Sequence, residues 1–276
     1  MHEKSVADDM ISQIKSYFEI PGHLKSVRSR ADFQRTTMAS TGSWLINDLT
    51  FISWINRKYP LVWICGGPGT GKSHLSYKAI EKLESVYPPD TNSAHKVSVA
   101  YFYIEENDPD LTELASIFKS IAYQISDMNV SYRQHLAKFM HEHRQFASPI
   151  ELWKGIFIDF FADSNTDGSA MIVLDGLDEA QADTVQLLFD FFEDIDFSST
   201  PSRLSFLIFS RPEVHERIGT RVQNHALKIV IRDQNAEDIK QYVKGQIPQV
   251  ALVKETLRIG KSKEDRNELQ RKILST

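Results

Sequence analysis

The chain has 276 residues, of which 41% are hydrophobic and 25% charged, enough for one large domain or one domain with a small appendage. Its net charge of −5, without a block of lysine and arginine, gives no sign of a nucleic-acid footprint. No run of about 20 apolar residues predicts a membrane span, no signal-peptide pattern follows Met1, and the single Cys65 cannot form an internal disulfide. We therefore expect a cytoplasmic protein, with Cys65 as a small core residue.

The first segment of the chain predicts a helix with one apolar stripe. Four apolar residues recur at every fourth position, namely Val6, Met10, Ile14 and Phe18. The pair Pro21-Gly22 ends this pattern. Two interpretations stay open: a helix that leads into the core and packs on it, or the start of a longer effector region. We assign residues 1–34 to an N-terminal helical lead-in.

Residues 66–73 read GGPGTGKS, the pattern of a phosphate-binding loop. An apolar strand, 61–65, precedes the loop, and a helix predicted over 74–86 follows it. This arrangement points a row of backbone N–H groups and a helix dipole at an anion. Lys72 is expected to reach the β- and γ-phosphates as a catalytic cation, and the Ser73 hydroxyl to ligate Mg²⁺. The predicted nucleotide-binding residues are Gly66, Gly67, Pro68, Gly69, Thr70, Gly71, Lys72, Ser73 and His74.

Strands and helices alternate after this loop. Residues 97–104 predict a strand, and a helix follows from Asp110, with Glu113 placed as in a capping box. A further helix is predicted to start at Ser148, because proline occupies its first position and Glu151 its third.

Another apolar strand, 170–174, leads into an acidic turn. Asp175 at the strand tip suits Mg²⁺ held together with Ser73. Asp178 and Glu179 follow, where a carboxylate orients or deprotonates a water aimed at the γ-phosphate. The alternative is that both acids cap the helix expected from about residue 183.

A further apolar strand, 204–209, is followed by Ser210, Arg211 and Pro212. In P-loop NTPases with an additional strand, this position carries a polar residue that senses the γ-phosphate, and the planar guanidinium of arginine suits phosphate. The alternative is a surface arginine before a loop proline. A strand over 226–231 and a helix from Ala236 follow. Five strand candidates alternating with helices predict an α/β fold with a doubly wound parallel sheet and a ligand at the carboxyl ends of the strands.

Three segments together carry a family resemblance: GGPGTGKS, VLDGLDEA and FLIFSRPE. The chain resembles the NACHT domain of the STAND class of P-loop NTPases. The likeness covers about 35–247, and the segment from Thr41 to Ile64 is similar to the entry of this domain in fungal NOD-like receptor proteins. The resemblance implies the strand order 5-1-4-3-2, a domain at 35–248, and a charged helical tail at 249–276 that begins a truncated helical segment. The winged-helix segment, its nucleotide-contacting histidine and the sensor repeats of the family are not found in this sequence.

The resemblance implies a switch that binds ATP or ADP with Mg²⁺, hydrolyses ATP slowly and forms homo-oligomers in the ATP state of the full-length protein. Effector and repeat domains would be its partners there. A small-acceptor kinase and a non-hydrolysing nucleotide-binding scaffold are the alternatives. The guanine-reading pattern N/T-K-x-D does not occur, so adenine nucleotides are expected.

Two further clusters carry weaker signals. His135, His141, Glu142 and His143 do not match a metal-ligand spacing and are interpreted as a solvated helix face. The four tryptophans, Trp44, Trp54, Trp63 and Trp153, are expected to be buried anchors, with Trp44 or Trp54 as an alternative flank for the adenine.

Overall fold

The computed structural model describes residues 2–37, 41–88, 97–106, 108–143, 148–163, 165–166, 168–195, 201–232 and 235–246. The predicted tail at 249–276 lies outside these residues. Within them, none of the helices has the length and apolar character that crossing a membrane requires.

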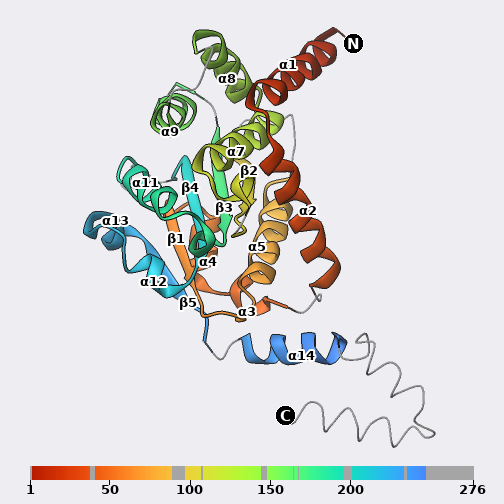
Figure 1. Ribbon diagram of the computed structural model, residues 1–276, viewed down its shortest axis with the longest axis vertical. Coiled ribbons are helices and arrows are strands. Elements are labelled where there is room, and N and C mark those ends of the chain that lie inside the picture. The colour runs from red at the N-terminus through yellow and green to blue at the C-terminus, as the bar shows by residue number, and fades with distance from the viewer. Residues whose placement is uncertain are drawn as a thin grey trace, which may run out of the picture.

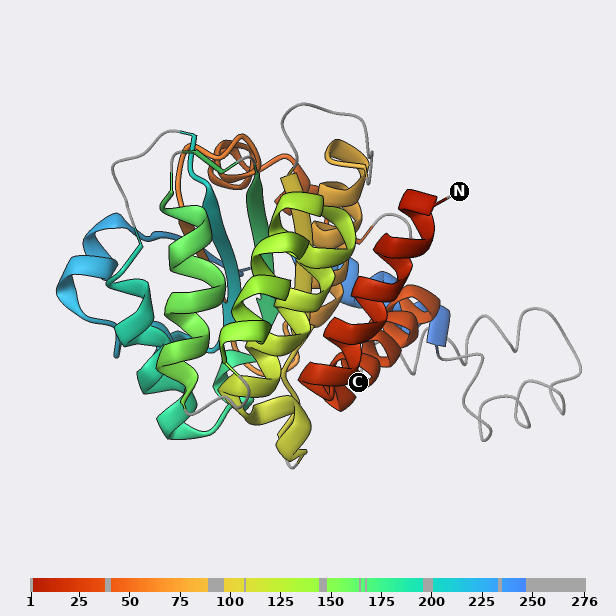
Figure 2. The same ribbon diagram turned by 90° about the horizontal axis from the view of Figure 1, so that it is seen from above.

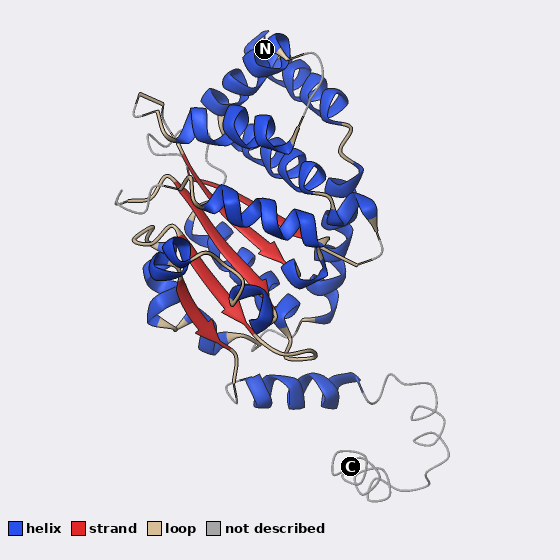
Figure 3. Ribbon diagram, turned by 60° about the vertical axis from the view of Figure 1, so that its left-hand side comes forward, coloured by secondary structure: helices blue, strands red, loops and turns tan. Residues whose placement is uncertain are grey.

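The centre of the molecule is a parallel sheet of five strands (Figures 1 and 3). The strands are β1 Leu61–Cys65, β2 Val97–Tyr103, β3 Ser169–Asp175, β4 Leu204–Ser210 and β5 Leu227–Val230. Their spatial order is β2-β3-β4-β1-β5. Read from the other edge this is 5-1-4-3-2, so the predicted fold class and strand order are confirmed.

The helices of the first half are α1 His2–Phe18, α2 Pro21–Thr36, α3 Ser43–Ile46, α4 Leu49–Ile55, α5 Lys72–Val86, α6 Pro109–Thr112, α7 Leu114–Met128 and α8 Val130–Glu142. The second half contains α9 Pro149–Leu152, the π-helix η1 Trp153–Ile158, α10 Asp159–Phe161, the 3₁₀ helix η2 Leu177–Glu179, α11 Ala182–Phe192, α12 Pro212–His215, α13 Thr220–His225 and α14 Ala236–Gln246.

Side chains of each strand alternate between two separate apolar layers. On β4, Phe206 and Ile208 join the layer that contains residues of α1, α7, α8, η1 and α11, whereas Leu207 and Phe209 join the layer built with α4 and α5. Figure 2 shows α7 and its neighbours covering one face, with α1 alongside. Because both faces are covered, the strands read as continuous apolar runs instead of alternating ones. The polar groups of a ligand site are therefore confined to the ends of the strands.

Side chains close the exposed edge of the sheet at β2. The buried Gln124 of α7 accepts a hydrogen bond from the Tyr101 N–H at 3.1 Å and donates to the Tyr101 carbonyl at 2.8 Å. The Ser26 hydroxyl of α2 accepts from the Tyr103 N–H at 2.9 Å. An open edge strand exposes unpaired N–H and C=O groups to other chains. Here α2 and α7 supply the missing partners.

The N-terminal helix packs on the core, since Ile14 and Phe18 are fully buried in the layer of α7. The predicted stop at Pro21 is only half right, because a second helix starts there. Proline is well tolerated in the first turn of a helix, where its missing N–H has no partner to lose. The chain thus forms two successive helices, and α2 extends past the predicted boundary at residue 34.

One predicted helix start is wrong and another is confirmed. Asp108, not Asp110, caps α6, and its side chain accepts from the Asp110 N–H. Glu113 is extended and its side chain makes no capping hydrogen bond, so the helix breaks there and α7 begins at the next residue. The cap at Ser148 is confirmed, because its hydroxyl accepts from the Glu151 N–H at 3.3 Å.

His215 on α12 is a buried imidazole whose two ring nitrogens have no hydrogen-bond partner among the described residues. Its ring meets the Trp63 indole edge-on at 5.5 Å. Burial lowers its pKa from 6.5, because the charged form loses water. The unfolded chain therefore binds more protons as pH falls through 6.5, and the folded state loses stability in that window.

We predict that His215→Leu makes the free energy of unfolding less sensitive to pH between about 7 and 5, near the ordinary pKa of histidine. Urea unfolding at several pH values measures this. His225→Leu, at an exposed position, is the matched control and should keep the parental pH dependence. An unchanged slope in the His215 variant would contradict the assignment.

Candidate nucleotide-binding site

The phosphate-binding loop leaves β1 and turns into α5 through glycines that no other residue replaces easily. Gly71 adopts φ 79° at the N-cap of α5, a left-handed conformation that favours glycine. A Cβ on Gly66 would lie 2.5 Å from the Thr70 hydroxyl and 2.9 Å from the Ile231 side chain. The loop therefore closes tightly and leaves the first N–H groups of α5 available to an anion.

Lys72 extends back over this loop. Its ammonium group donates to the Gly66 carbonyl at 2.9 Å and to the Gly67 carbonyl at 3.1 Å. The Thr70 hydroxyl also donates to the Gly67 carbonyl, at 2.8 Å. The cation is thus held above the loop, where a phosphate chain lying on the backbone amides would meet it.

Asp175 stands at the tip of β3, almost fully buried at 4% exposure. Burial raises the pKa of its carboxyl to about 7, and the charges of Glu179 and Asp178 add to this. A hydrogen bond from the Ser73 hydroxyl and the Lys72 charge act in the opposite direction. Its Oδ1 has no partner among the described residues. An orphaned carboxylate oxygen beside a serine hydroxyl is an oxygen donor set that suits Mg²⁺.

Asp178 and Arg211, predicted for separate tasks, are bonded to each other. The Arg211 backbone N–H donates to Asp178 Oδ1 at 3.1 Å, and the Arg211 Nε pairs with Oδ2 at 2.8 Å. Both residues line the same cavity. The alternative that Asp178 and Glu179 cap the next helix is wrong: they form η2, and Gln181 holds the N-cap position of α11.

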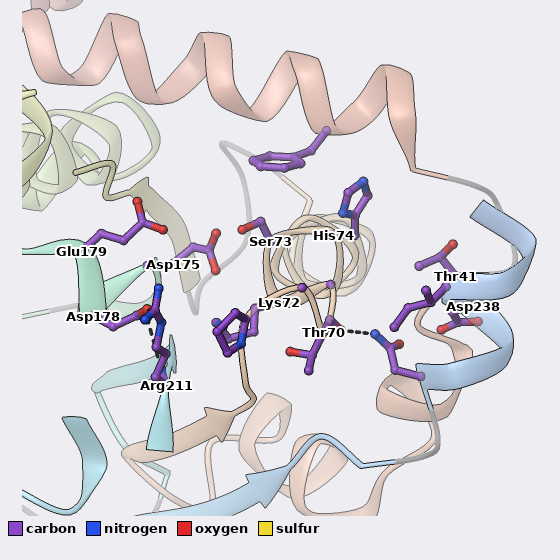
Figure 4. A pocket seen from close by; sticks show the side chains of 17 residues that line it. Thr41, Thr70, Lys72, Ser73, His74, Asp175, Asp178, Glu179, Arg211 and Asp238 are labelled. Atoms are coloured by element: carbon purple, nitrogen blue, oxygen red, sulfur yellow. Dashed lines mark hydrogen bonds and ion pairs between the residues drawn. The ribbon is translucent and has the colours of Figure 1, made fainter. Parts of the chain in front are cut away.

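Glu179 reaches the cavity with fewer partners. Its Oε2 accepts from the Glu106 N–H at 3.1 Å. Figure 4 shows its carboxylate with Asp175 and Asp178 on one side of the loop, while Thr41 and Asp238 lie on the other and Lys72 lies between.

The cavity has a volume of about 420 Å³. Its lining contains the predicted residues from Pro68 through His74 together with the three acids and Arg211. Gly66 and Gly67 do not line it and instead hold Lys72 through their carbonyls. The remaining lining residues are Phe33, Thr41, Gly176, Asn235, Asp238 and Ile239.

Contacts from α14 and from Asn235, the residue before it, were not predicted from the sequence. The buried Asn235 side chain donates to the Thr70 carbonyl of the loop and accepts from the Trp44 indole N–H at 3.2 Å. Asp238 accepts from the Gly42 N–H at 2.8 Å. Polar residues at the start of the predicted helix at Ala236 were the available signal, but nothing in the sequence paired them with residues 165 to 196 positions away.

Helix α2 contributes a second unpredicted wall. His74 lies 3.4 Å from the Thr36 hydroxyl through its Nε2, and its ring meets Phe33 edge-on at 5.4 Å. Burial lowers the pKa of His74, which favours the neutral imidazole. As for the tryptophans, Trp54, Trp63 and Trp153 are fully buried as expected, and Trp44 is partly buried against Asn235.

The predicted histidine cluster does not form a metal site. Within the described part of the chain, no group of three or more His, Cys, Asp and Glu side chains is placed to hold a metal ion. His135 is instead bonded through Nε2 to the Gly155 carbonyl at 2.7 Å. It is therefore partly a packing residue and not only part of a solvated face.

A phosphate-binding loop on β1, an acidic tip on β3 and an inserted β4 between them define a nucleotide-binding P-loop NTPase domain with an additional strand. The family described as nephrocystin 3, N-terminal, matches residues 40–211. This chain belongs to that family.

Among individual proteins, the chain is 24% identical over 219 residues to the vegetative incompatibility protein HET-E-1 of Podospora anserina. That alignment covers 75% of this chain and 15% of the relative. The family match and this relative confirm the resemblance to NACHT domains of the STAND class and to fungal NOD-like receptor proteins. The chain spans only a small part of the length of HET-E-1.

Solved structures with a related fold include Cdc6p from Pyrobaculum aerophilum, with a TM-score of 0.43, 15% identity and coverage of 80% of this chain and 52% of that one. The ADP form of the Aeropyrum pernix ORC2 protein has a TM-score of 0.46 and 13% identity, and covers 82% of this chain and 65% of that one.

We predict that Asp175→Asn stabilises the nucleotide-free protein at pH 8 by up to about 4 kcal/mol, the scale of a pKa displaced from 3.8 to about 7. Because the folded pKa of this carboxyl is raised, the protein loses stability progressively as pH rises from 3.8 to about 7, so the gain from the variant should shrink at pH 5. Thermal unfolding without Mg²⁺ measures it. Asp159→Asn, at an exposed position, is the control, and a destabilised Asp175 variant at pH 8 would contradict the prediction.

Proposed function

We propose that this domain binds ATP and ADP with Mg²⁺, hydrolyses ATP slowly and acts as a nucleotide-controlled signalling switch. One observation carries the proposal: Lys72, at the N-terminus of α5, and Asp175, which has one carboxylate oxygen without a partner among the described residues, line the same cavity. A polyphosphate needs a cation and backbone N–H donors, and its metal needs oxygen ligands.

Each residue then has a separate task. The loop amides accept the phosphate chain, and Lys72 exchanges its bonds to the Gly66 and Gly67 carbonyls for bonds to the β- and γ-phosphates. Ser73 and Asp175 hold Mg²⁺, which when bound neutralises charge on the phosphates. Glu179 orients or deprotonates the attacking water, with Asp178 as the second acid of the predicted pair.

The arrangement of the lining residues along the cavity indicates how the nucleotide lies. Asp175 and Arg211 mark the phosphate end, so the base lies toward Thr41 and Asp238 at the other end (Figure 4). This end is formed by the segment before α3 and by α14. We propose that adenine occupies it.

The switch role is supported by contacts that leave the cavity. Asn235 joins the loop carbonyl of Thr70 to α14, and Thr36 joins His74 to α2. A change of loop conformation on nucleotide binding therefore reaches both helices. We propose the domain division 1–34, 35–248 and 249–276, with homo-oligomers and effector and repeat domains belonging to the full-length protein.

One observation favours the alternative of a non-hydrolysing scaffold. Both oxygens of Asp178 already bond to Arg211, which leaves fewer free carboxylate oxygens for water. Phosphate release measured with Mg·ATP, with and without small acceptors, distinguishes the ATPase from the scaffold and from a kinase.

We predict that Lys72→Ala weakens Mg·ATP binding at least tenfold, because the cation over the β/γ-phosphates is lost. Calorimetric titration of the purified, folded variant measures this. Lys138→Ala removes the same charge from an exposed position on α8 and is the control. Parental ATP affinity in the Lys72 variant would refute the proposal.

We predict that Glu179→Gln slows ATP hydrolysis at least ~10²-fold while ATP affinity stays within a few-fold, the scale of lost general-base catalysis. Single-turnover phosphate release measures the rate. Glu105→Gln, a nearby glutamate bonded to Ser29, is the matched control. If the Glu179 variant hydrolyses ATP as fast as the parent protein, Glu179 does not act on the attacking water. If the parent protein itself hydrolyses ATP no faster than background, the scaffold alternative is favoured.

A further inference from the structure

We propose that Asp178 is a positioning residue for Arg211: it fixes the guanidinium so that its terminal nitrogens face the γ-phosphate, and the pair thereby sets the preference for ATP over ADP. This inference rests on the proposed function and separates two acids that the sequence could not tell apart.

The contacts between the two residues fix orientation as well as charge. Asp178 bonds to the backbone N–H and to the Nε of the same arginine. These two contacts hold the Arg211 side chain at its backbone and at its guanidinium, and so determine the orientation of the guanidinium. No contact to the two terminal Nη nitrogens is found among the described residues. The carboxylate is buried, with 8% of its side chain exposed, whereas the Arg211 side chain is 51% exposed and lines the cavity. The buried partner thus anchors the accessible one.

The backbone on both sides is fixed by the sheet. The Gly176 N–H donates to the Phe209 carbonyl at 3.2 Å, which ties the turn after β3 to the end of β4. A Cβ on Gly176 would lie 2.5 Å from the Ile104 carbonyl oxygen, so this turn is closely packed as well. Leu177, the first residue of η2, is fully buried. Asp178 therefore has little freedom to move toward a bound nucleotide.

Arginine recognises phosphate through a planar fork of N–H donors, and lysine lacks that fork. With Nε occupied by Asp178, the Nη donors are the part of the fork left for a ligand. ADP has no γ-phosphate at this end of the cavity, so only ATP gains from the arrangement. Glu179 Oε2 accepts from the Glu106 N–H, and Oε1 forms no hydrogen bond among the described residues. Glu179 is therefore left as the acid that acts on the attacking water.

The test is a double-mutant cycle on the full chain, with Mg·ADP and a non-hydrolysable Mg·ATP analogue as the titrants. We expect Arg211→Ala and Asp178→Asn each to lower the ratio of analogue affinity to ADP affinity about tenfold, which is about 1.4 kcal/mol. The double variant should lower it no further than Arg211→Ala alone. Glu193→Gln, which breaks the ion pair between Glu193 and Arg221 of α13, is the control and should leave the ratio unchanged.

Other outcomes overturn the inference in distinguishable ways. If Asp178→Asn raises the ratio, the carboxylate competes with phosphate for Arg211; if the ratio is unchanged or the two effects add, Asp178 has no positioning role. If the parent binds neither nucleotide, the proposed function itself fails.

A second variant avoids the buried position. Arg211→Lys keeps the charge at an accessible site but has no Nε to be held, so it should lose the ATP preference as fully as Arg211→Ala. A lysine variant that keeps the preference would show that a bare charge suffices, and would refute the inference.

Discussion

Strand β4 hydrogen-bonds to β1 on one side and to β3 on the other, and this placement governs the geometry of the site. Two strand spacings, about 10 Å, separate the phosphate-binding loop after β1 from the acidic turn after β3. Polar groups would be costly to bury inside a sheet that is covered on both faces, so they gather at the carboxyl ends of the strands. Arg211 follows β4 and so lies between the loop and the acids. The inserted strand leaves room for a polyphosphate and its metal and places a cation beside them.

The same arrangement stores an electrostatic cost. Asp175 is buried close to Asp178 and Glu179, and its pKa is raised to about 7 chiefly because the charged form loses water. Asp178, by contrast, is paired with Arg211. A carboxylate without a partner gains most from a cation. Under the proposed function, this contrast assigns metal binding to Asp175 and arginine positioning to Asp178, although both belong to one short acidic motif.

The sequence predicted what local patterns determine. The bounds of β1, the glycine loop and the acidic tip at Asp175 all follow from runs of apolar residues and turn chemistry within about a dozen positions. Pairings over long separations could not be read in this way. Arg211 and Asp178 are 33 positions apart, Gln124 and Tyr101 are 23 apart, and Asn235 and Thr70 are 165 apart. Each is a side-chain-to-backbone hydrogen bond, which depends on packing and leaves no periodic signal.

The cavity joins the family core to elements outside the matched residues 40–211. On one side α2 reaches His74 through Thr36 and Phe33, and on the other α14 reaches Thr70 and Gly42 through Asn235 and Asp238. These contacts fall on the loop and its flanks, and in the proposed complex these parts adjust as Lys72 exchanges the Gly66 and Gly67 carbonyls for phosphates. A ligand shifts an equilibrium only by its differential contacts with two states. We propose that α2 and α14 respond to the nucleotide through these hydrogen bonds.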